Sequence, residues 1–264
     1  MTMARRNRTT RLPAPYLKTI GLRADAMAAN TGYPFDLPWL QDPAFTLAFT
    51  TPVTIVIGEN GTGKSTLIEA IAAVAGYDEA GGGKGYRPVD HSRAIDRNGG
   101  LLAAALRAAW LPKVTNGWFF RAESFFSVAR YLDEAALDDP SAVPPDFLSW
   151  SHGEGFIRFF EERMRYQGIY FMDEPESALS PTRQIELLRV LDGVQRSARA
   201  QVIMATHSPI LMALPGARLL EITRRGIAEI ALAQTRHFRL YRAFIADPEG
   251  FVAEALRDPE ALRF

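Results

Sequence analysis

The chain has 264 residues, of which 47% are hydrophobic and 23% are charged, a composition typical of a folded globular protein. Its 30 basic side chains balance its 30 acidic ones, so net charge alone attracts neither nucleic acid nor an anionic membrane. The absence of cysteine excludes disulfides, thiolate catalysis and cysteine-ligated metals, and the four histidines lack zinc-binding spacing. We expect a cytoplasmic protein with no membrane-spanning segment of its own, because its apolar stretches are too short.

The first 57 residues predict a tail followed by strands. Residues 1–15 contain a basic run that we interpret as a flexible, solvated tail, with a nucleic-acid arm as the alternative. Apolar patterning predicts strands within residues 16–23 and 45–57. Between them lies a loop rich in proline and aromatic residues. Its Tyr33 and Phe35 are candidates to stack on an adenine ring, although either could simply pack in the core.

A glycine-rich loop follows the second of these strands and precedes an alanine-rich helical pattern at 67–74. It has the G-x-x-x-x-G-K-[ST] pattern, in which backbone N–H groups and a helix N-terminus surround phosphate oxygens. Lys64 would reach the β- and γ-phosphates, and the Ser65 hydroxyl would bind Mg²⁺. The alternative is a plain glycine-rich turn. The expected ATP-binding residues of this phosphate loop are Gly58, Glu59, Asn60, Gly61, Thr62, Gly63, Lys64, Ser65 and Thr66.

The chain between residues 76 and 145 has little regular patterning. Four closely spaced glycines predict an irregular segment over residues 76–97, and the apolar spacing predicts a helix over 101–110. A proline- and aspartate-rich stretch then closes the segment. We expect residues 78–145 to be a small, partly helical insertion.

Beyond residue 147 strands and helices alternate, which is typical of an α/β fold with a mainly parallel sheet flanked by helices. The hairpin signal at Gly226 favours an antiparallel edge. The C-terminal segment, residues 235–264, has the pattern of an amphipathic packing helix rather than of a nucleic-acid surface. The sequence predicts strands at 169–172, 201–205, 219–222 and 227–232, and helices from 156, at 182–195 and at 209–214.

Two carboxylates follow the apolar run at 168–172. Ligands bind at the carboxyl ends of strands in parallel sheets, so Asp173 and Glu174 are candidate site residues. Asp173 is suited to hold Mg²⁺, and Glu174 to orient and polarise an attacking water. Glu176 has the simpler interpretation of an acidic residue near a helix start.

Two further sequence motifs place polar residues at the starts of predicted helices. His207 follows a predicted strand, one helix–strand unit after the two carboxylates, and could contact the γ-phosphate. Ser208 is predicted to cap the next helix, with Pro209 at its first position. Ser151 and Glu154 have the spacing of a capping box.

The order of five motifs in this chain resembles that of the ABC-type ATPases. These motifs are the phosphate loop, Ser151 to Glu154, Asp173-Glu174-Pro175, Ser177 to Ser180 and Thr206-His207-Ser208. That superfamily includes transporter subunits and soluble chromosome-maintenance and DNA-repair ATPases. The chain is most similar to small bacterial AAA family ATPases with ABC-like motifs. The resemblance implies a P-loop NTPase fold, an ABC-type ATPase head, with residues 16–264 as one domain and residues 147–234 as the lobe carrying the signature and the Walker B strand.

The resemblance also implies that two copies enclose two ATP molecules. The signature residues Ser151 and Gly153 would then bind the γ-phosphate across a homodimer, with Glu154 as a further ATP-binding residue. Glu174 would be the catalytic base and His207 the switch histidine, and hydrolysis would open the dimer.

Two departures from the family pattern are present. The signature is Ser-His-Gly-Glu rather than serine, two glycines and glutamine. The glutamine that contacts magnesium has no clear match, and Glu123 is the best substitute by position, either as a metal ligand or as a residue that merely ends a strand.

These departures favour a soluble ATPase that acts on nucleic acid or on an unidentified partner protein in repair or defence. The alternatives are the ATP-binding subunit of an ABC transporter and a binding module without turnover, although a pure binding module would not need Glu174.

Overall fold

The computed structural model describes residues 11–26, 31–79, 81–84, 98–121 and 152–257. None of the helices in these ranges is both long enough and apolar enough to cross a membrane.

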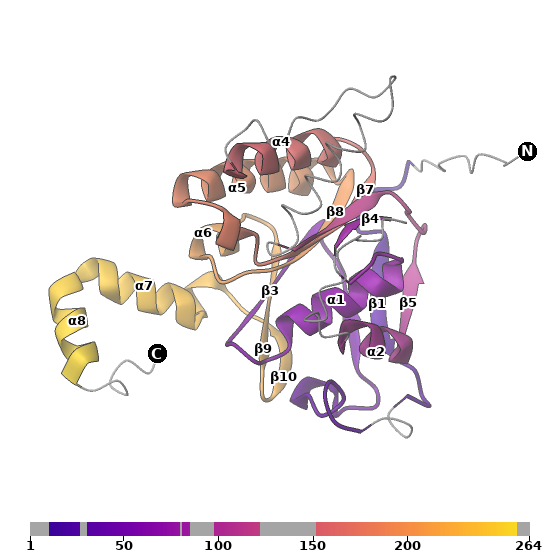
Figure 1. Ribbon diagram of the computed structural model, residues 1–264, viewed down its shortest axis with the longest axis horizontal. Coiled ribbons are helices and arrows are strands. Elements are labelled where there is room, and N and C mark those ends of the chain that lie inside the picture. The colour runs from indigo at the N-terminus through magenta and orange to yellow at the C-terminus, as the bar shows by residue number, and fades with distance from the viewer. Residues whose placement is uncertain (1–10, 27–30, 80, 85–97, 122–151, 258–264) are drawn as a thin grey trace, which may run out of the picture.

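A seven-stranded sheet in the order β10-β9-β3-β8-β7-β6-β4 forms the centre of the protein (Figure 1). Its five inner strands run parallel to one another, and an antiparallel strand forms each edge. The predicted parallel α/β sheet and the antiparallel edge at Gly226 are therefore confirmed. The strands are β3 (Val53–Gly58), β4 (Gly82–Gly83), β6 (Gly117–Arg121), β7 (Gly168–Asp173), β8 (Ala200–Ala205), β9 (Arg218–Thr223) and β10 (Gly226–Glu229).

Helices cover both faces of this sheet, each over its own apolar cluster (Figure 1). One face carries α1 (Lys64–Ala75) and α2 (Asn98–Ala105). The other carries α4 (His152–Met164), α5 (Pro181–Ser197) and the short α6 (Pro209–Met212). The strands β3, β7 and β8 are buried along their whole length, as expected for parallel strands between two helical layers.

A three-stranded antiparallel sheet, β2-β1-β5, lies beside the α1 layer. It consists of β1 (Leu17–Leu22), β2 (Thr46–Ala48) and β5 (Leu106–Trp110). The predicted helix over 101–110 is wrong in its second half, because α2 ends at Ala105 and the chain continues as β5. The alanines favour a helix only weakly, and pairing with β1 outweighs that preference.

Strands also occur inside the expected insertion of residues 78–145. Both β4 and β6 belong to the central sheet, and β6 pairs with β7 so that Arg121 lies opposite Asp173. The described part of this segment is thus continuous with the main fold rather than an appendage. Residues 85–97 and 122–151 lie outside the described residues.

The C-terminal segment forms α7 (Arg236–Ala246) and α8 (Pro248–Arg257), which extend away from the sheet as an arm (Figure 1). No residue of either helix is fully buried, so the predicted packing helix is more exposed than the sequence pattern suggested. The described residues also include three short 3-10 helices: η1 (Pro38–Leu40), η2 (Pro175–Ala178) and η3 (Leu232–Gln234).

Candidate nucleotide site

The phosphate loop connects β3 directly to the N-terminus of α1. Two of its glycines are required by the backbone. Gly58 has φ +153°, and a Cβ there would lie 2.7 Å from the carbonyl oxygen of Ile222. Gly63 has φ +90°, and a Cβ would lie 2.9 Å from the Leu37 side chain. The loop conformation therefore depends on glycine at both positions.

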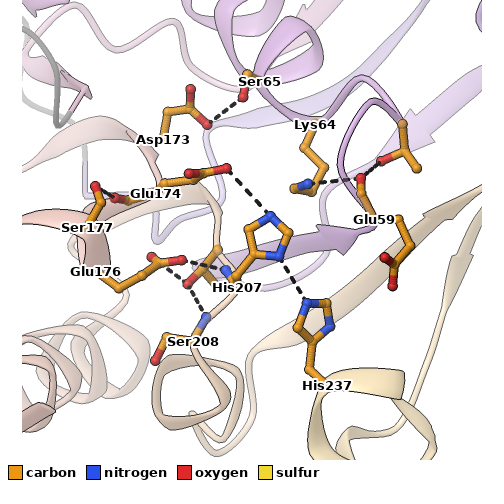
Figure 2. A network of polar contacts seen from close by, with 12 residues as sticks. Glu59, Lys64, Ser65, Asp173, Glu174, Glu176, Ser177, His207, Ser208 and His237 are labelled. Carbon is orange, nitrogen blue, oxygen red and sulfur yellow. Dashed lines mark hydrogen bonds and ion pairs between the residues drawn. The ribbon is translucent and has the colours of Figure 1, made fainter. Parts of the chain in front are cut away.

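Two side-chain contacts hold this loop. The Trp39 indole N–H donates to the carbonyl of Thr62 at 2.9 Å, and Lys64 Nζ donates to the carbonyl of Glu59 at 3.1 Å. Lys64 is only 5% exposed. Burial lowers the pKa of its ammonium group, while the carboxylates of Glu174 and Asp173 oppose that shift. Figure 2 shows Lys64, Asp173 and Glu174 at the same end of the sheet.

Adjacent strand ends bring the predicted residues together. Ala205 at the end of β8 lies opposite Val56 of β3 on one side and Asp173 of β7 on the other. The Thr206 N–H donates to the Val56 carbonyl at 3.2 Å, and the Glu174 N–H donates to the Ala205 carbonyl at 3.0 Å. The phosphate loop, the two carboxylates and His207 therefore share one edge of the sheet, as the sequence predicts (Figure 2).

Asp173 faces the start of α1, where Ser65 Oγ donates to Asp173 Oδ1 at 3.1 Å. A hydroxyl and a carboxylate at this separation supply the hard oxygen ligands that Mg²⁺ prefers. No group of three or more metal-binding side chains occurs in the described part of the chain. This donor set fits a Mg²⁺ held by few protein atoms together with phosphate oxygens and water.

Glu174 has an unusual backbone conformation, with φ +46° in the left-handed region. Its carbonyl accepts hydrogen bonds from the backbone N–H of Ser177 at 3.1 Å and from the Ser177 hydroxyl at 2.7 Å. Such strain costs on the order of 1–3 kcal/mol in a residue other than glycine and is concentrated at functional sites. Here it turns the carboxylate toward His207.

The Glu174 carboxylate lies 3.5 Å from Nε2 of His207 and is 42% exposed. The contact with His207 lowers the pKa of Glu174, and burial opposes this shift. The carboxylate is therefore ionised at neutral pH and able to accept a proton.

Glu176 has a larger role than the sequence suggested. Its carboxylate accepts hydrogen bonds from the Thr206 hydroxyl at 2.7 Å and from the His207 N–H at 2.5 Å. It thus fixes the backbone that carries His207 (Figure 2). The only sequence signal was a third acidic residue soon after the strand.

Two residues at the start of α7 also reach the site, and the sequence predicted neither as a site residue. His237 Nε2 lies 2.9 Å from Nδ1 of His207, and Arg236 forms an ion pair with Glu59 of the phosphate loop at 3.0 Å. Figure 2 shows His207 between Glu174 and His237. No motif marks these positions, because the contact depends on where the C-terminal helix begins.

The signature residues are only partly described. Ser151 lies outside the described residues, as does Glu123, so the roles expected of both stay predictions. Gly153 and Glu154 lie in the first turn of α4, where Glu154 pairs with Arg183 of α5. The predicted capping of α6 by Ser208 is confirmed, since its hydroxyl accepts from the Leu211 N–H at 3.3 Å.

The two adenine candidates differ in their surroundings. Phe35 is 6% exposed and packs in the core with Leu37 and Trp39, so it is not available for stacking. Tyr33 is 47% exposed, and its hydroxyl hydrogen-bonds that of Thr66 at the start of α1. Tyr33 stays a candidate.

Two family models match separate parts of the chain, and both matches extend into the expected insertion of residues 78–145. Residues 39–102, which include the phosphate loop, match a model described as an AAA domain. Residues 135–213 match a model described as "AAA domain, putative AbiEii toxin, Type IV TA system". The second match includes Asp173, Glu174 and His207.

Two curated relatives are ATP-binding proteins of bacterial importers. The methionine import ATP-binding protein MetN 1 of Pseudomonas fluorescens (strain Pf0-1) is 28% identical over 171 residues, covering 58% of this chain and 49% of that protein. Together with the two AAA domain matches, this relative shows that the chain is similar to ABC-type and AAA ATPases. The thiamine import ATP-binding protein ThiQ of Cereibacter sphaeroides is 28% identical to this chain over 174 residues, covering 58% of the chain and 70% of that protein.

The chain therefore spans about half the length of the first of these relatives. Among solved structures, it is similar to one described as "An inward-facing conformation of a putative metal-chelate type ABC transporter", with 14% identity and a TM-score of 0.47. That match covers 86% of this chain and 88% of the other chain. A likeness at this level carries no weight for the fold or the function of this chain.

Proposed function

We propose that this chain binds ATP with Mg²⁺ at the shared edge of β3, β7 and β8 and hydrolyses it. The observation that carries the proposal is the convergence of Lys64, Asp173, Glu174 and His207 at the carboxyl ends of three adjacent parallel strands. Ligands of open α/β sheets bind at this edge.

The phosphate loop and Lys64 would bind the triphosphate. Backbone N–H groups at the start of α1 present partial positive charge, and the Lys64 ammonium group adds a full charge. Lys64 contacts the Glu59 carbonyl within the loop, so its position is set before the nucleotide binds. The conformational entropy that the Lys64 side chain loses when the nucleotide binds is therefore small.

Ser65 and Asp173 would hold the magnesium ion. When bound, Mg²⁺ neutralises charge on the phosphate oxygens. Asp173 is 8% exposed, so its carboxylate has limited freedom and is directed at Ser65.

Glu174 would act as the general base for the attacking water. An ionised carboxylate beside the Lys64 ammonium group is suited to orient a water and take its proton. His207, 3.5 Å from Glu174, would then contact the γ-phosphate. These roles account for the strained Glu174 backbone, which a purely structural turn would not need.

A second copy of the chain would complete the site. We propose that Ser151, together with Gly153 in the first turn of α4, binds the γ-phosphate held by the phosphate loop of the other copy, because a helix N-terminus is suited to bind an anion. Glu154 of the same turn would be a further ATP-binding residue. What supports a contribution from another copy is that α1 and α4 cover opposite faces of the same sheet (Figure 1). Loss of the γ-phosphate would remove this contact and open the dimer.

Steady-state ATP hydrolysis by the wild-type protein and by Glu174→Gln tests the proposed reaction. The amide keeps the shape of the side chain but cannot accept the proton, so we expect hydrolysis to fall by roughly 100-fold or more. Binding of fluorescent ATP should persist. Glu161→Gln on α4, whose wild-type carboxylate forms a surface ion pair with Arg165, is the matched control and should keep wild-type activity. A Glu174→Gln variant with undiminished turnover would remove the base from the mechanism.

We further propose that hydrolysis serves a cytoplasmic process in nucleic-acid repair or in defence. The family description that names a toxin of a type IV toxin–antitoxin system supports the defence role. The alternative is an ATP-binding subunit of a membrane transporter, which the two importer relatives favour.

Capture of partners from cells with the Glu174→Gln protein separates these two roles, with Lys64→Ala as the control that should not bind ATP. Recovery of nucleic acid or of a protein without membrane spans supports the first role. Recovery of a multi-span membrane protein supports the second.

A further inference from the structure

The start of α7 is firmly anchored although the rest of this helix is exposed. Thr235 is fully buried, its hydroxyl donates to the Leu232 carbonyl at 2.8 Å, and it accepts from the Phe238 N–H at 3.1 Å. Arg236 adds the ion pair with Glu59 at 3.0 Å. His237 lies between Arg236 and Phe238 in this anchored segment, and its ring contacts His207.

The rings of His237 and His207 are in contact in a tilted arrangement. The ring centroids are 5.1 Å apart at an interplanar angle of 55°, and His237 Nε2 lies 2.9 Å from His207 Nδ1. A hydrogen bond at this distance needs a proton on one of these two nitrogens and a lone pair on the other. The tautomers of the two rings are thus linked.

The second ring nitrogen of His207, Nε2, decides whether His207 Nδ1 or His237 Nε2 carries the proton of this hydrogen bond. His207 Nε2 is buried, has no hydrogen-bond partner among the described residues, and faces the Glu174 carboxylate at 3.5 Å. A lone pair at Nε2 would oppose the carboxylate oxygens, so the proton belongs on Nε2. In neutral His207 the Nδ1 atom is then an acceptor, and His237 must donate.

The charges around His237 are compatible with a neutral donor. Burial and the neighbouring His207 lower the pKa of His237, and Lys64 and Arg236 act in the same direction while Glu59 opposes them. A neutral His237 with its proton on Nε2 can donate that proton to His207 Nδ1.

We propose that His237 is a positioning residue that fixes the proton of His207 on Nε2, directed at Glu174 and the γ-phosphate position. The catalytic meaning of this contact rests on the proposed ATP hydrolysis, whereas the contact itself does not. Through it, the docking of the C-terminal arm controls whether His207 presents an N–H or a lone pair to the reacting groups.

Nitrogen-15 NMR of the histidine rings tests the contact directly, with the His207 signals identified by their loss in His207→Gln. The wild type should show His207 protonated on Nε2. His237→Gln keeps a side-chain N–H donor and should retain this state. His237→Phe keeps an aromatic ring but no donor, and His207 should then populate both tautomers. An unchanged His207 ring signal in His237→Phe overturns the proposal, whatever the activity.

Kinetics test the consequence of the contact. His237→Phe should lower kcat at least about tenfold with KM for ATP little changed, and His237→Gln should restore kcat. Ile245→Ala, on the same helix but 72% exposed, is the control for general damage to the arm. A changed tautomer with an unchanged kcat overturns the positioning role. A wild-type protein without ATPase activity would contradict the proposed function, while the ring signals would still decide the contact between the two histidines.

Discussion

Ser65 Oγ lies 3.1 Å from Asp173 Oδ1, although the two residues are 108 positions apart in the chain. The contact joins the start of α1 to the end of β7 with two oxygen atoms suited to Mg²⁺. Asp173→Asn keeps the size of the side chain but removes its charge. We expect the Mg²⁺ concentration for half-maximal hydrolysis to rise about tenfold or more.

Magnesium titrations of ATPase activity measure this shift. Asp192→Asn on α5, which loses only an ion pair with the exposed Arg196, is the control and should match the wild type. An unchanged magnesium dependence in Asp173→Asn would remove Asp173 from the metal site.

Lys64 is buried in the site, and its ammonium group donates a hydrogen bond to the Glu59 carbonyl of the phosphate loop. Lys64→Ala removes a charge directed at the phosphates, so we expect ATP hydrolysis to fall on the order of 100-fold or more. The control is Lys113→Ala, in which the lost ammonium group lies 5.8 Å from the centroid of the Trp110 ring. Equal turnover in the two variants would contradict phosphate binding at this loop.

The sequence predicted the phosphate loop, Asp173, Glu174 and His207 because each follows a strand whose apolar residues are buried without interruption. In a parallel sheet such strand ends meet at one edge, so the motif order already implied their proximity. At these positions the residue types and the order of the strands both indicated one site, and the structure brings the residues together.

The sequence was less informative where tertiary contacts decide the outcome. Residues 106–110 have a helical composition, yet they form β5 because β1 offers backbone partners. Likewise, β6 is too short to be distinguished from a buried helical turn by its apolar pattern alone. The contacts of Glu176 and His237 depend on how η2 and α7 are placed against β8, which no local pattern encodes.

Glu176 fixes the backbone at Thr206 and His207 with two hydrogen bonds. Glu176→Ala leaves the His207 N–H without its carboxylate partner, so we expect the free energy of unfolding to fall by about 2 kcal/mol. Urea denaturation measures this change. Glu161→Ala, which breaks only an exposed i,i+4 ion pair, should stay close to the wild type. Similar losses in the two variants would show that Glu176 has no special structural role.

The lowered pKa of His237 predicts how stability depends on pH. Below the ordinary value of 6.5, the unfolded chain binds a proton at this position more readily than the folded chain does. The contribution of His237 is therefore fully present above pH 6.5 and is lost as the pH falls toward its folded pKa. His237→Gln should lose less stability over this range than the wild type does. Urea denaturation at a series of pH values tests this, and parallel curves for the two proteins would contradict it.

The association state of Glu174→Gln tests the composite ATP site most directly. Without a base to consume the nucleotide, this variant should keep ATP between two copies of the chain. Sedimentation velocity should show a monomer without nucleotide and a dimer at saturating ATP with Mg²⁺. A variant that binds ATP under these conditions and stays monomeric would contradict the account of a site completed by a second copy.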